Sequence, residues 1–268
     1  MAKILAVTNQ KGGVGKTTTA VNLSACLATL GQRVLMIDLD PQGNATTGCG
    51  ITKRVALPTV YQILIGRSTL AEARIKTEFA FDILPANREL AGAEVELIEM
   101  GQREYRLRDA LASAHDEYDF ILMDCPPALN MLTVNGLVAA EAVMIPMQCE
   151  YYALEGLTDL VATLKKVRAN LNPALEIEGL LRTMFDPRST LTQQVSGELE
   201  GHFGDKVYRT IIPRNVRLAE APSYGKPVVA FDRNSKGAQA YLSLAQEMLD
   251  RRDGAKSAAK AVAQGANA

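Results

Sequence analysis

Residues 10–18 form a glycine-rich stretch that directly follows the apolar run 3–8. After Gln10, its members are Lys11, Gly12, Gly13, Val14, Gly15, Lys16, Thr17 and Thr18. A strand, a glycine-rich turn and the start of a helix are the context of a phosphate-binding loop. There the backbone N–H groups and the positive helix end face the phosphates, Lys16 neutralises the β- and γ-phosphates, and Thr17 offers its hydroxyl to Mg²⁺. The pattern therefore predicts a nucleoside triphosphate site that uses Mg²⁺.

This loop departs from the ordinary G-x-x-x-x-G-K-[ST] pattern in two ways. Gln10 stands where that pattern has its first glycine, and Lys11 places a second lysine inside the loop. A turn that only joins two elements needs neither two lysines nor a pair of threonines. The sequence also has no Asn-Lys-x-Asp segment of the guanine-reading kind, which favours adenine. We therefore expect a modified phosphate-binding loop that binds ATP.

Acidic residues end two of the expected strands. Asp38 and Asp40 precede a Pro-Gln-Gly turn, and Asp124 follows the apolar run 120–123 in the Walker B pattern, whose acid holds Mg²⁺, usually through water. Each motif is weak alone, because Asp ends many strands as a turn former. Together with the loop they place three sites at the carboxyl edge of one sheet, where such folds bind ligands. For Asp38, a buried, hydrogen-bonded acid and a direct catalytic role are equally good interpretations.

Length and composition fit one large α/β domain. The chain has 268 residues, of which 47% are hydrophobic, and a net charge of −1, so any nucleic-acid binding must come from a local patch. It contains no apolar run of about 20 residues and no signal-peptide pattern, so we expect a cytoplasmic protein. The four cysteines show no C-x-x-C spacing, which favours buried free thiols over a zinc site or disulfides.

Apolar runs and helical patterns alternate along the whole chain. We expect strands at Lys3–Thr8, Arg33–Leu39, Phe81–Pro85, Asp119–Asp124, Ala142–Gln148, Ile177–Met184 and Val207–Ile212, and a helix at Thr17–Leu30. Continuously apolar strands separated by helices indicate a mostly parallel central sheet covered by helices on both faces. We expect one domain over 1–250, followed by an Ala-rich tail over 251–268 that is frayed or disordered.

Basic residues outnumber acidic ones between 204 and 237. The basic residues are Lys206, Arg209, Arg214, Arg217, Lys226, Arg233 and Lys236, and the acidic ones are Asp205, Glu220 and Asp232. Such an excess suits contacts to DNA phosphates that do not depend on sequence. By charge alone, an ordinary solvated surface explains it better.

Several further segments, together with the loop, carry a resemblance to a known family. They are 38–44, Leu90–Glu94, Asp124–Pro127, Gln148–Gly156 and Ile212–Pro222. The chain resembles the deviant Walker ATPases, specifically the ParA/Soj partitioning branch, over roughly residues 2–250. The resemblance implies an ATPase that assembles as a nucleotide-sandwich homodimer, in which Lys11 reaches the ATP of the other subunit and stabilises charge on the transferring phosphoryl group.

The resemblance also implies roles for other residues and partners. Asp40 would help position the attacking water, Asp124 would contact Mg²⁺ indirectly, and Pro213 and Asn215 would flank the adenine. Arg188 and Arg217 would contribute to nonspecific binding of double-stranded DNA, so the protein would associate with the nucleoid. A ParB-type DNA-binding partner would stimulate hydrolysis. No helix-turn-helix segment precedes the loop, so sequence-specific operator binding is not expected.

Three alternatives share the same loop. A membrane-cycling ATPase similar to MinD needs a C-terminal amphipathic helix with bulky apolar residues, which 251–268 does not provide. An iron–sulfur electron carrier resembling nitrogenase reductase needs paired cysteines with their own surrounding motifs. The third alternative is a binding module without turnover, against which the intact Lys16, Thr17, Asp40 and Asp124 argue. The sequence leaves open whether a chromosome or a plasmid is moved.

Overall fold

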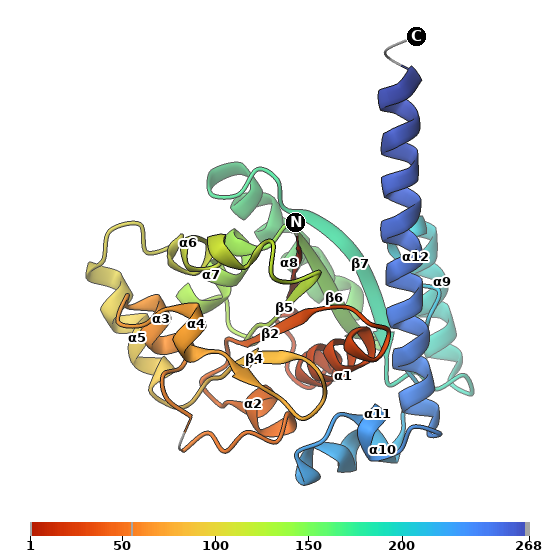
Figure 1. The fold of residues 1–268 in the computed structure, drawn as a ribbon. Helices are drawn as coiled ribbons and strands as arrows, with labels where there is room; N and C mark the ends of the chain where they lie inside the picture. Colours follow the sequence, from red (N-terminus) through yellow and green to blue (C-terminus); the bar gives the residue numbers. More distant parts are fainter. Residues whose placement is uncertain (1, 55, 266–268) are drawn as a thin grey trace.

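The computed structural model describes residues 2–54 and 56–265, which fold around one seven-stranded sheet in the order β3-β4-β2-β5-β1-β6-β7 (Figure 1). The strands are β1 Lys3–Val7, β2 Val34–Asp38, β3 Ile75–Lys76, β4 Asp82–Leu84, β5 Phe120–Asp124, β6 Ala142–Gln148 and β7 Glu176–Thr183. The two-residue β3 pairs antiparallel with β4, and the other strand pairs are parallel. The expected mostly parallel sheet is therefore confirmed.

Helices cover both faces of the sheet. They are α1 Lys16–Thr29, α2 Asn44–Gly48, α3 Val60–Leu64, α4 Leu70–Ala73, α5 Leu90–Glu96, α6 Arg106–Ala110, α7 Met131–Ala139, α8 Ala153–Asn170, α9 Thr190–Phe203, α10 Val216–Glu220, α11 Val228–Phe231 and α12 Lys236–Gly265. Short 3₁₀ turns lie at Leu97–Glu99, Ala112–Ala114, Gly204–Lys206 and Ala221–Tyr224.

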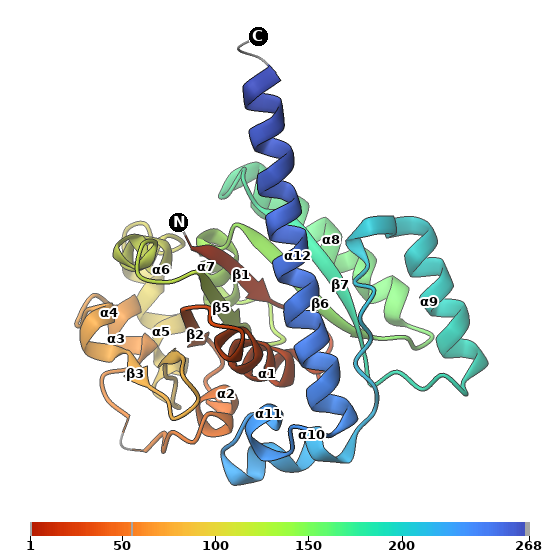
Figure 2. The same ribbon diagram turned by 45° about the vertical axis from the view of Figure 1, so that its right-hand side comes forward.

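Alternate strand residues enter two separate cores. In β1, Leu5 and Val7 pack into the core formed with α1, α11 and α12, whereas Ile4 and Ala6 pack into the core formed with α3 to α9. Figure 2 shows α1 and α12 side by side in front of the sheet, with α8 and α9 near its β7 edge. Burial on both faces explains why the strands are apolar throughout and do not alternate with polar residues.

Six of the seven predicted strands are present, and their ends differ from the prediction by at most one residue. The prediction of a strand at Val207–Ile212 is wrong. Among the described residues this segment makes one isolated bridge, between Leu180 and Val207. Its backbone N–H groups at Arg209 and Thr210 donate to the Glu247 carboxylate, both at 2.9 Å, in place of a strand ladder. The Glu247 side chain of α12 and the backbone carbonyls of Leu180 and Arg182 in β7 therefore accept from this segment's N–H groups.

The frayed or disordered tail expected over 251–268 stays a prediction. Helix α12 continues to Gly265, and its last part extends away from the body of the molecule (Figures 1 and 2). Residues 266–268 lie outside the described residues. Within the described ranges, none of the helices is both long enough and apolar enough to cross a bilayer.

Candidate nucleotide-binding site

The glycine-rich loop joins the carboxyl end of β1 to the start of α1. Gly13 and Gly15 have φ values of 74° and 89°, a region that residues with a Cβ rarely adopt, so the turn depends on glycine at both positions. Gly15 caps α1, and no side chain in the described structure bonds to this helix end. The first N–H groups of a helix have no partners inside the helix. This end of α1 therefore presents free donors and a positive dipole, which suit a phosphate group.

Lys16 is the first residue of α1 and is almost fully buried. Its Nζ donates to the carbonyl oxygen of Lys11 at 3.0 Å. Burial lowers the pKa of Lys16, while the carboxylates of Asp124 and Asp40 act in the opposite direction. A buried ammonium needs a compensating anion. The β- and γ-phosphates of a nucleotide would provide that anion.

Asp38 ends β2 and is fully buried. Thr46 of α2 donates to its carboxylate twice, from the backbone N–H at 2.8 Å and from the hydroxyl at 2.7 Å, and the Asp40 N–H donates at 3.1 Å. Burial raises the pKa of Asp38 to about 6, against the effect of the Thr46 hydrogen bonds. Of the two interpretations from sequence, this geometry favours the buried, hydrogen-bonded acid. The sequence analysis did not identify Thr46, which has only the signal of lying one turn after the Asp-x-Asp segment.

Asp124 ends β5, and both of its carboxylate oxygens are buried without a hydrogen-bond partner among the described residues. Burial and the nearby charge of Asp38 raise its pKa well above the usual range, while Thr17 and Lys16 act the other way. Buried polar groups normally have partners, so this carboxylate fits a site that a hydrated cation completes.

The residues present suit Mg²⁺ bound together with a nucleotide. Residues 2–54 and 56–265 contain no group of three or more His, Cys, Asp or Glu side chains that could hold a metal ion. Mg²⁺ in nucleotide sites keeps several waters and uses only one or two protein oxygens besides the phosphates. Thr17 and Asp124 are the candidates for that limited set.

Asp40 lies in the turn between β2 and α2 and is half-buried. Its Oδ1 accepts a hydrogen bond from the Gln42 N–H at 2.9 Å, which holds the side chain within the turn. Asp40 is also close enough to Lys16 to oppose the lowering of the lysine pKa. The structure thus brings Asp40 near the loop without burying it.

A cavity of about 200 Å³ opens beside the loop. It is lined by Gly15, Thr18, Thr183, Met184, Ile212, Pro213, Arg214, Asn215, Leu218, Ala219 and Tyr241. Pro213 and Asn215, about 200 residues from the loop in sequence, therefore lie next to it in space. The Thr183 hydroxyl donates to the Val14 carbonyl at 2.8 Å and fixes the end of β7 against the loop. Sequence reasoning missed Thr183, Met184 and Tyr241, since nothing in their local sequence indicates the site.

Lys11, the other lysine of the loop, lies at the surface. Its side chain is 44% exposed, and its Nζ forms an ion pair with Glu150 Oε2 at 2.7 Å. The two lysines of the loop thus occupy different environments, one buried beside Asp124 and one at the surface.

The two arginines expected to bind DNA are exposed and already paired with acids. Arg188, with a side chain 88% exposed, pairs with Asp186 at 2.8 Å. Arg217 of α10 pairs with Glu220 at 2.8 Å and Asp232 at 3.2 Å. Arg217 directly precedes Leu218, which lines the cavity beside the loop, so α10 joins this surface to the candidate nucleotide site.

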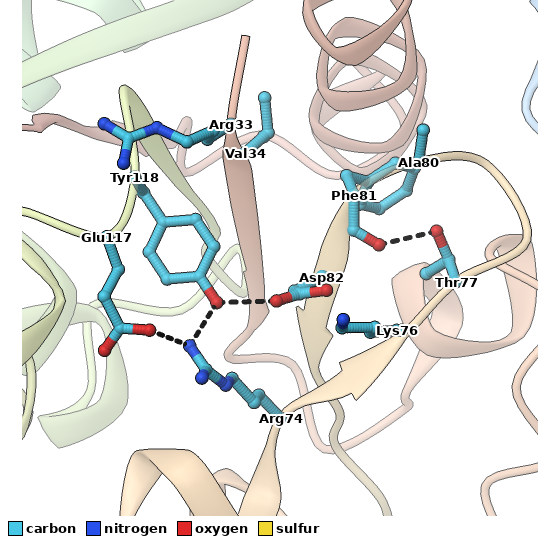
Figure 3. A pocket seen from close by; sticks show the side chains of 10 residues that line it. All are labelled: Arg33, Val34, Arg74, Lys76, Thr77, Ala80, Phe81, Asp82, Glu117 and Tyr118. Atoms are coloured by element: carbon cyan, nitrogen blue, oxygen red, sulfur yellow. Dashed lines mark hydrogen bonds and ion pairs between the residues drawn. The ribbon is translucent and has the colours of Figure 1, made fainter.

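A separate cavity of about 440 Å³ lies at the opposite edge of the sheet (Figure 3). Its walls include Arg33, Phe81 and Tyr118, which lie just before the amino ends of β2, β4 and β5. The Tyr118 hydroxyl donates to Asp82 at 2.7 Å and accepts from Arg74 at 2.8 Å. These polar groups satisfy one another, so the edge with the glycine-rich loop is the better candidate site.

The four cysteines are free and buried, as predicted. A glycine-rich loop between a central parallel strand and a helix, flanked by acids at the ends of two strands, defines a P-loop nucleoside triphosphatase. A family model described as an AAA domain matches residues 2–177.

Comparison with known proteins identifies the branch of this class. The chain is 53% identical to the chromosome partitioning protein ParA of Caulobacter vibrioides, covering 93% of this chain and 94% of that protein. It is also 53% identical to the sporulation initiation inhibitor protein Soj of Bacillus subtilis, covering 92% and 98%. The chain belongs to the ParA/Soj family of chromosome partitioning ATPases.

A solved structure with a different name has the same fold. Cobyrinic acid a,c-diamide synthase from Mycobacterium smegmatis superposes with a TM-score of 0.83 at 37% identity, covering 94% of this chain and 96% of that one. That protein was crystallised with ADP and magnesium, and also with an ATP analog and magnesium.

Proposed function

We propose that this chain is a DNA-partitioning ATPase, in which Mg-ATP drives formation of a sandwich homodimer that binds DNA without sequence preference. Hydrolysis, stimulated by a ParB-type partner, would release the dimer from DNA. The nucleotide part rests on two buried charged groups near an uncapped helix N-terminus: the ammonium of Lys16, and the carboxylate of Asp124, which has no hydrogen-bond partner among the described residues. The magnesium and nucleotide of the Mycobacterium smegmatis structures support the same assignment.

Within this proposal, each residue of the site has a distinct task. Lys16 and the N–H groups of the loop bind the phosphates, and Pro213 and Asn215 line the cavity for the base. Thr17, and Asp124 through water, would hold Mg²⁺, which shields the phosphate charge when bound. Asp40 orients the attacking water. Its moderate exposure and turn position suit a residue that acts on water more than on the nucleotide itself.

Lys11 supports the dimer part of the proposal. Its side chain is partly exposed and paired with Glu150, whereas Lys16 already supplies a buried cation to the phosphate site of its own chain. A second lysine in that position is available to the nucleotide of a partner chain. A cation arriving in trans would stabilise charge developing on the transferring phosphoryl group.

The DNA part rests on Arg188 and Arg217 and on the excess of basic residues between 204 and 237. Acids pair with both arginines in the single chain. One chain therefore offers few free cations, and two chains with this surface on one face would double them. Binding through phosphates is steeply dependent on salt and largely independent of sequence.

DNA binding measured side by side with ATP, ADP and no nucleotide tests the proposal. We expect DNA binding only with ATP, and none for Lys16→Ala. Phosphate release in the same preparation separates an ATPase from a binding module. Co-sedimentation with anionic vesicles, run in parallel, separates the proposal from a membrane-cycling ATPase. Equal DNA binding in all three nucleotide states would contradict the proposed switch.

A further inference from the structure

Glu150 contacts the glycine-rich loop although it lies far from the loop in sequence. It sits in the turn between β6 and α8, 139 residues after Lys11, and its Oε2 accepts from Lys11 Nζ at 2.7 Å. Gln148, two residues earlier, donates from Nε2 to the Gly13 carbonyl at 3.2 Å. The segment 148–150 thus contacts the loop at two points. None of the roles described so far uses Glu150.

A chain of contacts connects Glu150 to the buried lysine. Glu150 holds the side chain of Lys11, and the backbone carbonyl of Lys11 accepts from Lys16 Nζ at 3.0 Å. The Lys16 ammonium has three N–H donors, so it can bind phosphates while it keeps this bond to the Lys11 carbonyl. The phosphate-binding lysine and the residue that Glu150 restrains are thus in direct contact.

The surface around the pair is uncovered and partly apolar. Tyr151 and Tyr152 directly follow Glu150, are 73% and 68% exposed, and contact each other edge to face with ring centroids 5.0 Å apart. Two exposed tyrosines next to an exposed ion pair make this segment a surface that a second copy of the chain could cover.

We propose that Glu150 is a positioning residue that holds Lys11 over its own loop and competes with the partner's nucleotide phosphates for the lysine ammonium. This inference rests on the proposed function, in which Lys11 acts in trans. In the nucleotide-free chain, the ion pair with Glu150 competes with the contact that the Lys11 ammonium would make to the partner's nucleotide in the dimer. Glu150 thereby sets how much ATP-bound protein is needed for the dimer to form.

The size of the effect follows from the exposure of the pair. The Lys11 and Glu150 side chains are 44% and 50% exposed, and exposed ion pairs are worth little because water and salt screen them. We therefore expect the restraint to change dimer affinity by about two- to fivefold at low salt. The effect should disappear at high salt, where exposed charges are screened over a few ångströms.

The test measures dimerisation of Glu150→Gln by sedimentation velocity with a non-hydrolysable ATP analogue and Mg²⁺. We expect its dimer dissociation constant to be about two- to fivefold lower than that of the wild type at low salt. Glu155→Gln is the matched control, because Glu155 is an exposed acid in the first turn of α8 and makes the same charge change. It should behave like the wild type.

Salt separates the ion pair from a structural effect. At high salt, where the exposed pair is screened, Glu150→Gln and the wild type should have equal dimer dissociation constants. A dimer of Glu150→Gln that is unchanged or weaker than wild type would overturn the inference while leaving the proposed function intact. A wild-type chain that stays monomeric with the ATP analogue would overturn the proposed function, and this inference with it.

Discussion

Asp38 and Asp124 lie opposite each other in register at the carboxyl ends of β2 and β5, yet in the part of the chain that the structure describes only Asp38 accepts hydrogen bonds. Both carboxyls are fully buried, and the charge of Asp38 adds to burial in raising the pKa of Asp124. Thr46 and the Asp40 N–H satisfy Asp38, so that acid shapes the turn after β2. Asp124 is left for a positively charged group, which in this class of protein accompanies the nucleotide.

The unpartnered Asp124 should make the nucleotide-free protein less stable as pH rises. Its folded-state pKa lies above the unfolded value, so the folded chain binds this proton more tightly, and the associated stability is present at low pH and lost as pH rises through the folded pKa. Asp124→Asn should remove this pH-dependent loss of stability, because asparagine does not titrate. Both chains are unfolded with urea between pH 4 and 8, without nucleotide or Mg²⁺. The free energy of unfolding of the variant should increase relative to that of the wild type as pH rises.

The comparison with Asp124→Asn is necessary because other groups titrate in the opposite sense. The pKa of Asp186, for example, is lowered to about 2 by Arg188 and contributes stability that is lost as pH falls. Such terms are common to both chains and cancel in the difference. A difference in unfolding free energy that is constant over this pH range would contradict the assignment of a raised pKa to Asp124.

Thr46→Val should destabilise the protein by about 1–3 kcal/mol, the usual cost of leaving buried polar groups unsatisfied. The Thr46 hydroxyl donates to Asp38 at 2.7 Å and accepts from the Ala86 N–H at 2.9 Å, and valine removes both bonds. Thr47→Val, at the exposed next position of α2, is the matched control and should change stability by less than about 0.5 kcal/mol. Urea unfolding at one pH measures both. Equal effects of the two variants would argue against the Thr46 link.

Lys16→Ala and Lys11→Ala should separate nucleotide binding from dimerisation. Lys16→Ala removes the buried cation and should abolish ATP binding, whereas Lys11→Ala should bind ATP normally and remain a monomer. Titration calorimetry at low protein concentration and light scattering with an ATP analogue measure the two properties. Normal ATP affinity in Lys16→Ala would contradict the phosphate-loop assignment. Dimerisation of Lys11→Ala with the affinity of the wild type would contradict the proposal that Lys11 acts on the partner's nucleotide.

Asp40→Ala should bind ATP and dimerise but hydrolyse it very slowly. Asp40 is proposed to orient water without holding the nucleotide, so its loss should lower the turnover rate and leave binding unchanged. Phosphate release and light scattering on the same sample test the separation. Gln42→Ala, in the same turn, is the control. Turnover at the wild-type rate in Asp40→Ala would remove that residue from the mechanism.

Arg217→Gln should weaken ATP-dependent DNA binding and reduce its dependence on salt, while leaving dimerisation intact. Glutamine is preferable to glutamate here, because Glu220 and Asp232 already face Arg217, and a third acid would add local repulsion. Arg33→Gln is the matched control, since Arg33 is also an exposed arginine paired with an acid but lies at the opposite edge of the sheet. Filter binding at several salt concentrations gives the slope of the logarithm of the DNA-binding constant against the logarithm of the salt concentration. An unaltered slope in Arg217→Gln would place the DNA surface elsewhere.

The sequence alone determined the parts of this protein that depend on local pattern. The glycines at 13 and 15, the lysine at 16 and the aspartates that end two apolar runs were recognisable because a phosphate loop and a strand end need those residue types at that spacing. The six strands with continuous apolar runs were predictable for the same reason, since burial on both faces leaves a strong signal. Val207–Ile212 carries a similar signal, but Glu247 accepts from two of its backbone N–H groups, and no local pattern reveals that.

Only the tertiary structure decided which distant residues share the site. Thr46 meets Asp38, Thr183 and Tyr241 reach the loop, and Glu150 meets Lys11, because a parallel sheet gathers the carboxyl ends of strands that are far apart in the chain. The same applies to charge: the sequence counts Arg217 as a free cation, whereas folding pairs it with Asp232, 15 residues later. Burial and pairing are properties of three-dimensional neighbours, which composition and spacing do not specify.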